Sequence, residues 1–208
     1  MYMRVTSALV PPDKVNASID YFKKNVLPRV RRAPGNVGVV LLVDRQTGES
    51  FGTTCWESAR AQGAAEQVSI ETRTQSPRNV PGTQIINVER FEVALFDSAA
   101  APEVGNAVLL TSGTVDPGKL VGGIGQIRDH VLPVARAQKG YRATVVAFDR
   151  QADRLLWLTV WDDRALLDAS ENPLDPPRED AARVLELTES LRRHMLEAAA
   201  VDMTGLAK

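Results

Sequence analysis

Residues 35–58, GNVGVVLLVDRQTGESFGTTCWES, decide the fold, because residues 140–163, GYRATVVAFDRQADRLLWLTVWDD, repeat them without a gap. Equivalent residues in these stretches, and in the segments before them, are 105 positions apart. The clearest equivalents are Asp44 and Asp149, Trp56 and Trp161, Pro28 and Pro133, and Thr6 and Thr111. This spacing matches the length of a small domain and is far too long for a solenoid repeat. The sequence therefore predicts two copies of one domain in tandem.

The composition limits the class of protein. The chain has 208 residues, a net charge of −1 and a single cysteine, Cys55. This charge gives no electrostatic footprint for nucleic acid or an acidic membrane, and one cysteine excludes an intrachain disulfide. The first residues, MYMRVTSALV, form too short an apolar run for a secretory signal, and no run approaches the length of about 18 apolar residues that a membrane span needs. We therefore expect a cytoplasmic protein that binds neither nucleic acid nor a membrane.

The first copy has the element order of a ferredoxin-like unit. Its apolar residues alternate in some segments and recur at helical spacing in others, with Gly and Pro at the boundaries. The expected elements are a strand over Arg4–Val10, a helix from Lys14 that Gly35 ends, strands over Val37–Asp44 and Ser50–Trp56, a helix from a cap at Ser58 to about Ile70, a loop over Ser76–Thr83 and a strand over Gln84–Phe96. The order β-α-β-β-α-β predicts a split βαβ fold.

The second copy repeats this order at first and then departs from it. The expected elements are a linker over residues 98–106, a strand over Ala107–Val115, a helix over Lys119–Ala137, strands over Arg142–Asp149 and Arg154–Trp161, a short helix over Arg164–Ala169, a break at Asn172–Pro177, an amphipathic helix over Glu179–Ala200 and a short final strand within Val201–Leu206. The predicted domains are therefore residues 1–97 and 107–208.

Several of these motifs resemble a known family. A helix ending in VLPxxR is followed by Gly, then VVLLVDRQTG, then a strand ending in TxWES, and then VERFEVAL. The combination is similar to the antibiotic biosynthesis monooxygenase-like (ABM) domains of the dimeric α/β-barrel superfamily. The resemblance implies an α+β fold in which two ferredoxin-like units form a barrel. Because both units lie on one chain, it implies an intrachain pseudodimer and leaves a further homodimer open.

The third strand of each copy carries the candidate ligand-binding residues. In the second copy Trp157, Thr159 and Trp161 lie on one face, opposite an aliphatic face. We expect the aliphatic face to pack on the helices and the other face to look into the space between the sheets. Gly52 stands opposite Trp157 in the alignment, so any two pockets would differ. The candidate ligand-binding residues are Trp56, Trp161, Trp157, Thr54, Thr159, Thr6 and Thr111. The alternative for a strand-end tryptophan is a core or interface anchor.

No catalytic residue is predicted. The resemblance implies that active members pair the tryptophan with an Asn on an early strand or a His on the following helix, but the first strands lack Asn, and Gln62 and Ser170 stand where the family often has His. His130 and His194 are interpreted as surface or helix-end residues, and no metal or cofactor is expected. Arg4 is interpreted first as an edge or snorkelling arginine, with an anion partner as the alternative.

Two further interpretations concern small residues. Cys55 is expected to be a buried small hydrophobe on the helix-facing side of its strand. The glycines in Gly122-Gly123-Ile124-Gly125 lie in a helix without the lysine of a phosphate loop, so they indicate close approach of a neighbouring element or a ligand.

Three functions compete at this stage. The first is a protein that binds a small aromatic or apolar ligand between sheet and helices without robust catalysis. The second, which the resemblance implies, is a cofactor-independent monooxygenase acting on an aromatic polyketide or quinone-like substrate. The third, single-stranded RNA binding, needs basic charge that the chain lacks. The missing Asn/His pair favours the first.

Overall fold

A computed structural model describes residues 1–187 and 191–206. The strands in this part of the chain are β1 (Tyr2–Leu9), β2 (Asn36–Val43), β3 (Glu49–Trp56), β4 (Gln84–Ser98), β5 (Ala107–Thr114), β6 (Tyr141–Asp149), β7 (Arg154–Trp161) and β8 (Arg192–Asp202). Hydrogen bonds join them in the closed order β1-β3-β2-β8-β5-β7-β6-β4. The fold is therefore α+β, an antiparallel closed barrel built from two βαββαβ halves, as the repeat predicts.

The helices follow the repeat closely. They are η1 (Pro12–Lys14), α1 (Val15–Tyr21), η2 (Phe22–Val26), α2 (Leu27–Arg31), α3 (Ala59–Ala64), α4 (Glu66–Asn79), η3 (Pro117–Lys119), α5 (Leu120–Gln126), η4 (Ile127–Val131), α6 (Leu132–Ala137), α7 (Arg164–Val184) and η5 (Thr204–Leu206). The segments η2 and η4 are π-helical turns, and each directly precedes a helix with proline at its second position. Pro28 and Pro133 lack a backbone N–H, and the wider turn lets the chain pass them without ending the helix.

The chain divides into two compact units that follow strand pairing and not the repeat. Unit 1 is Met1–Arg90 with the end of the chain from Glu197, and unit 2 is Phe91–Leu196. The reason is that Glu92–Ser98 of β4 pairs with β6, whereas Glu197–Asp202 of β8 pairs with β2. Each copy therefore gives part of its last strand to the other unit, and the boundaries predicted at residues 97 and 107 do not describe the compact units.

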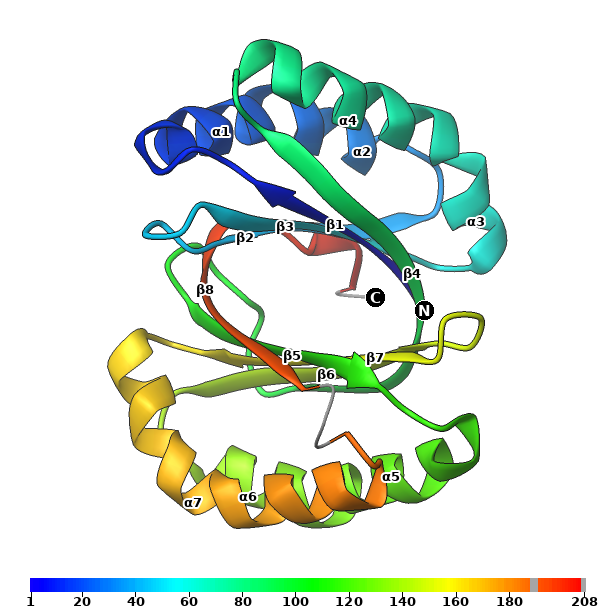
Figure 1. Cartoon of the computed structure of the whole chain (residues 1–208), viewed down its shortest axis with the longest axis vertical. Helices are drawn as coiled ribbons and strands as arrows, with labels where there is room; N and C mark the ends of the chain where they lie inside the picture. The colour runs from blue at the N-terminus through cyan, green and yellow to red at the C-terminus, as the bar shows by residue number, and fades with distance from the viewer. Residues whose placement is uncertain (188–190, 207–208) are drawn as a thin grey trace. The chain divides into compact units, whose positions relative to one another are not determined.

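Each unit packs helices on one face of its own strands (Figure 1). In unit 1, Figure 1 shows α1, α2 and α4 together on one side of β1, β2 and β3. In unit 2 it shows α5, α6 and α7 on one side of β5, β6 and β7. The predicted hairpins are confirmed, with Gly48 in the left-handed conformation that its tight turn requires. The predicted cap at Ser58 is also present, since Ser58 accepts from Ala61 N, and Asp163 caps α7 in the same way by accepting from Leu166 N.

The helices after the two hairpins are longer than predicted. The expected loop over residues 76–83 is wrong because α4 continues through Pro77 to Asn79. The break expected over residues 172–177 is also wrong, since α7 runs through three prolines. Buried positions recur at helical spacing along α7 and hold it against the sheet: Leu167, Ser170, Leu174, Ala181 and Leu185. This buried stripe outweighs the hydrogen bonds that the prolines lose.

The amphipathic helix expected over residues 179–200 is wrong beyond Val184, where α7 ends, because Arg192–Asp202 forms the strand β8. Residues 188–190 of that prediction lie outside the described part of the chain. The segment RRHMLEAAAVD has helix-forming composition, but Val39–Val43 of β2 pairs with Glu197–Asp202 and buries three alanines, Ala198, Ala199 and Ala200. Pairing with a neighbouring strand here overrides local helix propensity.

Candidate functional site

The threonine–tryptophan face of each third strand meets the helices of its own unit. In unit 2, Trp161 packs in one cluster with Leu167 and Leu174 of α7. In unit 1, Trp56 packs with Val26 and Val30. The expected orientation towards the space between the sheets is therefore wrong, and each unit has a cavity between its sheet and its helices. Alternation gives the two faces of a strand but does not identify the one that helices cover. By the same alternation Cys55 is on the face away from the helices, contrary to expectation.

The two equivalent tryptophans are core residues that hold threonine hydroxyls. Trp56 and Trp161 are both 0% exposed. Trp56 Nε1 donates to Thr54 Oγ1 at 3.0 Å, and Trp161 Nε1 donates to Thr159 Oγ1 at 3.2 Å. Tyr141 meets Trp161 edge to face, with ring centroids 5.6 Å apart. Their burial matches the alternative role of core anchor, and each one fixes a threonine that lines a cavity.

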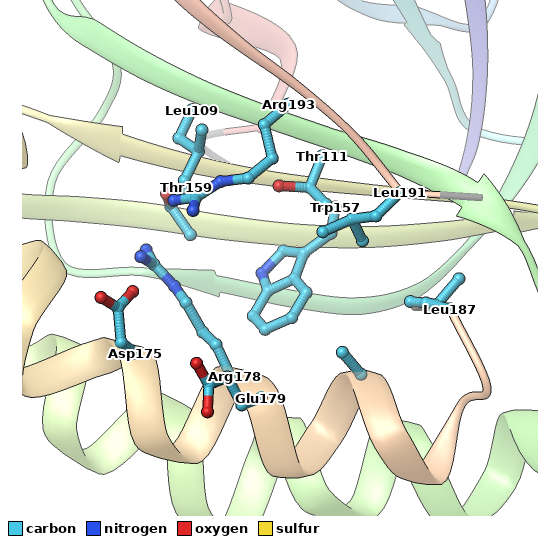
Figure 2. Close-up of a pocket in the computed structure, with 11 residues that line it drawn as sticks. Leu109, Thr111, Trp157, Thr159, Asp175, Arg178, Glu179, Leu187, Leu191 and Arg193 are labelled. Carbon is cyan, nitrogen blue, oxygen red and sulfur yellow. The ribbon is translucent and has the colours of Figure 1, made fainter. Parts of the chain in front are cut away.

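Unit 2 contains a cavity of about 280 Å³ between its sheet and α7 (Figure 2). Strands β5 and β7 contribute Leu109, Thr111, Trp157 and Thr159, α7 contributes Asp175, Arg178, Glu179 and Ala182, and the chain after α7 contributes Leu187, Leu191 and Arg193. Figure 2 shows the Trp157 indole extending from its strand towards α7, and the guanidinium groups of Arg178 and Arg193 pointing into the same space. Three predicted site residues, Trp157, Thr159 and Thr111, thus meet here.

Two donors in this cavity lack hydrogen-bond partners. Trp157 is 5% exposed, and neither its Nε1 nor Nη2 of Arg178 has a partner among the described residues. The rest of the Arg178 guanidinium is fixed, because Nη1 donates to Glu171 Oε1 at 2.6 Å. Arg193 binds the other oxygen of the same carboxylate. An unpaired buried donor costs about 1–3 kcal/mol, so an acceptor oxygen placed between these two groups would be bound favourably.

Carboxylates outnumber guanidinium groups by three to two around the unit 2 cavity. Arg178 and Arg193 face three carboxylates, those of Glu171, Asp175 and Glu179. Burial lowers the pKa of Arg178, and the hydrogen bond that Arg178 donates to Glu171 opposes this effect. The group remains a cation at neutral pH, because the pKa of arginine starts far above 7. With no excess of positive charge, the cavity suits a neutral ligand or a weakly acidic one better than a strong anion.

Unit 1 has a smaller cavity of about 90 Å³ at the equivalent place. Thr6 and Thr54, both predicted site residues, line it together with Arg4. Arg4 is not an edge or snorkelling residue: it is 1% exposed and forms an ion pair with Glu66 at 2.6 Å. Burial lowers the pKa of Arg4 and the Glu66 carboxylate opposes that shift. The predicted inequality of the two halves is confirmed by the volumes of the two cavities.

The sequence analysis missed a pair of charged residues that both copies keep. Glu171 and Arg178 form an ion pair on α7, and Glu66 and Arg73, 105 residues earlier, form the same pair on α4 at 2.9 Å. A Glu and an Arg seven positions apart lie on one face of a helix, and this spacing recurs in both copies. The repeated Glu and Arg spacing could therefore have predicted this pair. It was overlooked because residues 172–177 were predicted to break the helix that carries Glu171 and Arg178.

The remaining candidates lie away from the cavities or have structural roles. Gln62 and Ser170 are buried in the helices, and His130 is exposed on η4. Burial raises the pKa of the Cys55 thiol to about 12. The predicted close approach at Gly123 is confirmed, because a Cβ there would lie 2.1 Å from Leu185 Cδ2. Within residues 1–187 and 191–206 no group of His, Cys, Asp or Glu is arranged to hold a metal, and no helix is long and apolar enough to cross a membrane.

Sequence comparison finds relatives of this chain that are uncharacterised. No family model matches the chain. The uncharacterised protein Rv2557 of Mycobacterium tuberculosis H37Rv is 27% identical over 175 residues, which are 84% of this chain and 76% of that protein. Sequence similarity thus extends over most of both proteins.

Solved structures resemble the chain over nearly its whole length. A candidate monooxygenase of Fusobacterium nucleatum has a TM-score of 0.73 at 13% identity, covering 97% of this chain and 93% of its own. An anthrone oxidase-like protein gives 0.66 at 15% identity, with coverage of 98% and 94%. A ferredoxin-fold protein of Listeria monocytogenes related to antibiotic biosynthesis monooxygenases gives 0.57 at 10% identity, with coverage of 94% of each chain. The resemblance to ABM-like domains in tandem is therefore confirmed at the level of the fold.

Proposed function

We propose that unit 2 binds a flat, largely apolar aromatic molecule that carries a carbonyl or phenolic oxygen, without robust catalysis. The observation that carries the proposal is the pair of unpartnered donors, Trp157 Nε1 and Arg178 Nη2, on one cavity of about 280 Å³. A ligand oxygen accepting from both would remove the cost of two buried, unpaired N–H groups. The Trp157 ring and the leucines of the cavity wall supply the apolar surface that an aromatic ring needs.

The size of the cavity limits the ligand. Pockets for drug-sized molecules measure about 300–1,000 Å³, so this cavity is at the lower end and favours one or two fused rings. A quinone with two fused rings presents carbonyl oxygens at its edge and apolar faces to the walls. A site with no excess of positive charge is also consistent with such a neutral ligand.

A second candidate is a cofactor-independent monooxygenase acting on an aromatic polyketide or quinone-like substrate. Asp175 and Glu179 favour it, because their carboxylates line the same cavity and are groups that can accept a proton. The described cavity residues include no histidine to assist them. The likeness to monooxygenase-like structures concerns the fold, and the choice between the two functions depends on whether the bound molecule reacts with oxygen.

The experiment is a titration of the whole protein with 1,4-naphthoquinone, followed by tryptophan fluorescence and by an oxygen electrode with the reduced quinone. Saturable quenching without oxygen uptake above the protein-free rate supports the binding function. Uptake that depends on the protein supports the monooxygenase. Arg178→Gln should weaken quinone binding about tenfold or more, since a hydrogen bond from a charged group contributes about 1.5–3 kcal/mol. Arg73→Gln, the matched change in unit 1, should leave it unchanged. No saturable binding would refute the proposal.

A further inference from the structure

The cavity of unit 1 differs from that of unit 2 at two equivalent positions. Arg4 stands 105 residues before Leu109, and Gly52 stands 105 residues before Trp157. Unit 1 therefore has a cation where unit 2 has an aliphatic side chain, and open backbone where unit 2 has an indole. A Cβ built on Gly52 would meet only the Phe22 ring at 3.6 Å and Thr6 O at 4.0 Å.

Several contacts hold Arg4 in place in the wall of this cavity. Its Nη2 donates to Glu66 Oε2 at 2.6 Å and to Gln62 O at 2.7 Å, while Nη1 donates to Ser69. The guanidinium carbon also lies 5.8 Å from the centroid of the Trp56 ring. These contacts fix the Arg4 guanidinium in one orientation, so the N–H of Arg4 Nε, which has no described partner, also has a fixed direction.

The surroundings of Arg4 carry an excess of positive charge. Glu66 pairs with Arg4 at 2.6 Å, with Arg73 at 2.9 Å and with Arg90 at 2.8 Å. Three guanidinium groups thus share one carboxylate, which leaves two positive charges without a counter-charge in this cluster. In unit 2 the equivalent pair, Arg178 and Glu171, lies among further carboxylates. The two cavities therefore differ in charge as well as in size.

Donors without partners point to what would supply that counter-charge. Arg4 Nε, Arg73 Nη1 and the Thr83 hydroxyl are buried atoms on residues that line this cavity, and none has a hydrogen-bond partner among the described residues. Arg4 and Thr83 are more than nine-tenths buried. The other lining residues include a set of apolar side chains: Val10, Phe22, Val26, Val30, Leu41 and Ile85. Arg4 Nε and Arg73 Nη1 thus belong to two side chains that meet at Glu66, whereas Thr83 lies near the end of β1 beside Pro11, and much of the remaining wall is hydrocarbon.

We propose that the unit 1 cavity binds a small carboxylate with a short hydrocarbon tail. The carboxylate accepts from Arg4 Nε and Arg73 Nη1, and the tail lies against the apolar side chains. A volume of about 90 Å³ holds several waters, which is room for a molecule of about four to six non-hydrogen atoms. Ordered water could satisfy the donors but would not offset the excess positive charge, so a carboxylate fits better.

The test is calorimetric titration of the whole protein with sodium butyrate, sodium acetate and sodium phosphate at constant ionic strength. Butyrate should bind saturably at one site. It should bind about tenfold more tightly than acetate, because each of its two extra methylenes contributes about 0.8 kcal/mol when buried. Phosphate should bind more weakly than butyrate, since it has no tail for the apolar wall. Absence of saturable binding, or phosphate binding at least as tightly as butyrate, would overturn the proposal.

Variants locate the site. Arg73→Gln should weaken butyrate binding about tenfold or more, because it removes a donor to a charged oxygen. Arg73→Lys keeps a cation beside Glu66 and should retain part of the binding, which separates loss of the donor from a folding defect. Arg178→Gln, the matched change in unit 2, should leave butyrate binding unchanged. An equal loss in Arg178→Gln would place the anion in unit 2 and refute the assignment. These outcomes do not depend on whether the naphthoquinone binds.

Discussion

Replacing Trp157 by phenylalanine tests the unpaired indole donor on which the proposed function depends. Trp157 Nε1 is buried without a described partner, whereas Trp161 Nε1 donates to Thr159 Oγ1 at 3.2 Å. Both residues are buried in the same cluster, so Trp161→Phe is a matched control. The only intended difference between the two variants is the state of the lost N–H group.

The magnitudes follow from this difference. The smaller ring costs either variant about 1–2 kcal/mol of unfolding free energy. Trp157→Phe regains about 1–3 kcal/mol because it removes an unpaired donor, so its net effect is close to zero. Trp161→Phe loses a further hydrogen bond worth about 1 kcal/mol and is destabilised by about 2–3 kcal/mol. For a chain of this length, 1 kcal/mol shifts the melting temperature by about 2–4 °C.

The assay is thermal unfolding without ligand, followed by far-ultraviolet circular dichroism. We expect Trp161→Phe to melt about 5–10 °C below the parent protein and Trp157→Phe to melt within about 3 °C of it. The Trp157→Phe variant should nevertheless bind the naphthoquinone more weakly, which separates binding from stability. Equal destabilisation of the two variants would show that the Trp157 N–H is already satisfied in the free protein, and the argument for a ligand oxygen at that point would fail.

Two other predictions concern the folded units themselves. Burial would raise the pKa of Glu66, but hydrogen bonds from Arg90 and Arg73 outweigh it and lower that pKa. A depressed carboxyl pKa stabilises the protein above the unfolded value of about 4.3 and loses this effect as the pH falls through the folded value. Glu66→Gln should therefore cost about 3 kcal/mol in urea unfolding at pH 7, since it leaves buried Arg4 without its partner, and the difference from the parent should shrink below about pH 4. Gly123→Ala should lower the melting temperature, because its Cβ would clash with Leu185 at 2.1 Å and overpacking costs about 1–3 kcal/mol. Gly125→Ala in the same helix has open space and should raise stability by about 1 kcal/mol, so a loss in both variants would contradict the packing argument.

Much of the fold could be predicted because the internal repeat shows that the same element order occurs twice. The hairpins of both copies follow from alternating apolar residues around a turn, and Gly48 marks one of those turns. The last third of the second copy could not be read locally. Three prolines concealed α7, and alanine-rich composition concealed β8. The constant spacing was the better guide, since α4 ends at Asn79 and α7 ends 105 residues later at Val184.

The candidate site was predicted in part. Thr111, Trp157 and Thr159 line one cavity, and Thr6 and Thr54 line the other. The residue types and their alternation along each strand could be recognised in the sequence. The face that the helices cover could not be predicted, because it depends on contacts between segments far apart in the chain. Arg73 and Arg178, which carry charge in the two cavities, were not predicted. Their role depends on an ion pair with a glutamate seven positions earlier on the same helical face, Glu66 or Glu171.

Duplication on one chain explains how the two cavities came to differ. Two copies of an identical chain must carry every substitution twice, so an arginine at the position of Arg4 would be buried in both halves. Here the equivalent residue is Leu109, and the glutamate–arginine pair kept in both helices is used differently in each unit. In unit 1 Glu66 forms an ion pair with the buried Arg4. In unit 2 Glu171 forms an ion pair with Arg193, which lines the same cavity as Trp157, whose Nε1 has no described partner. Arg4→Leu should therefore reduce butyrate binding about tenfold or more and leave naphthoquinone binding unchanged. A parallel loss of both ligands would mean that the cavities do not act independently.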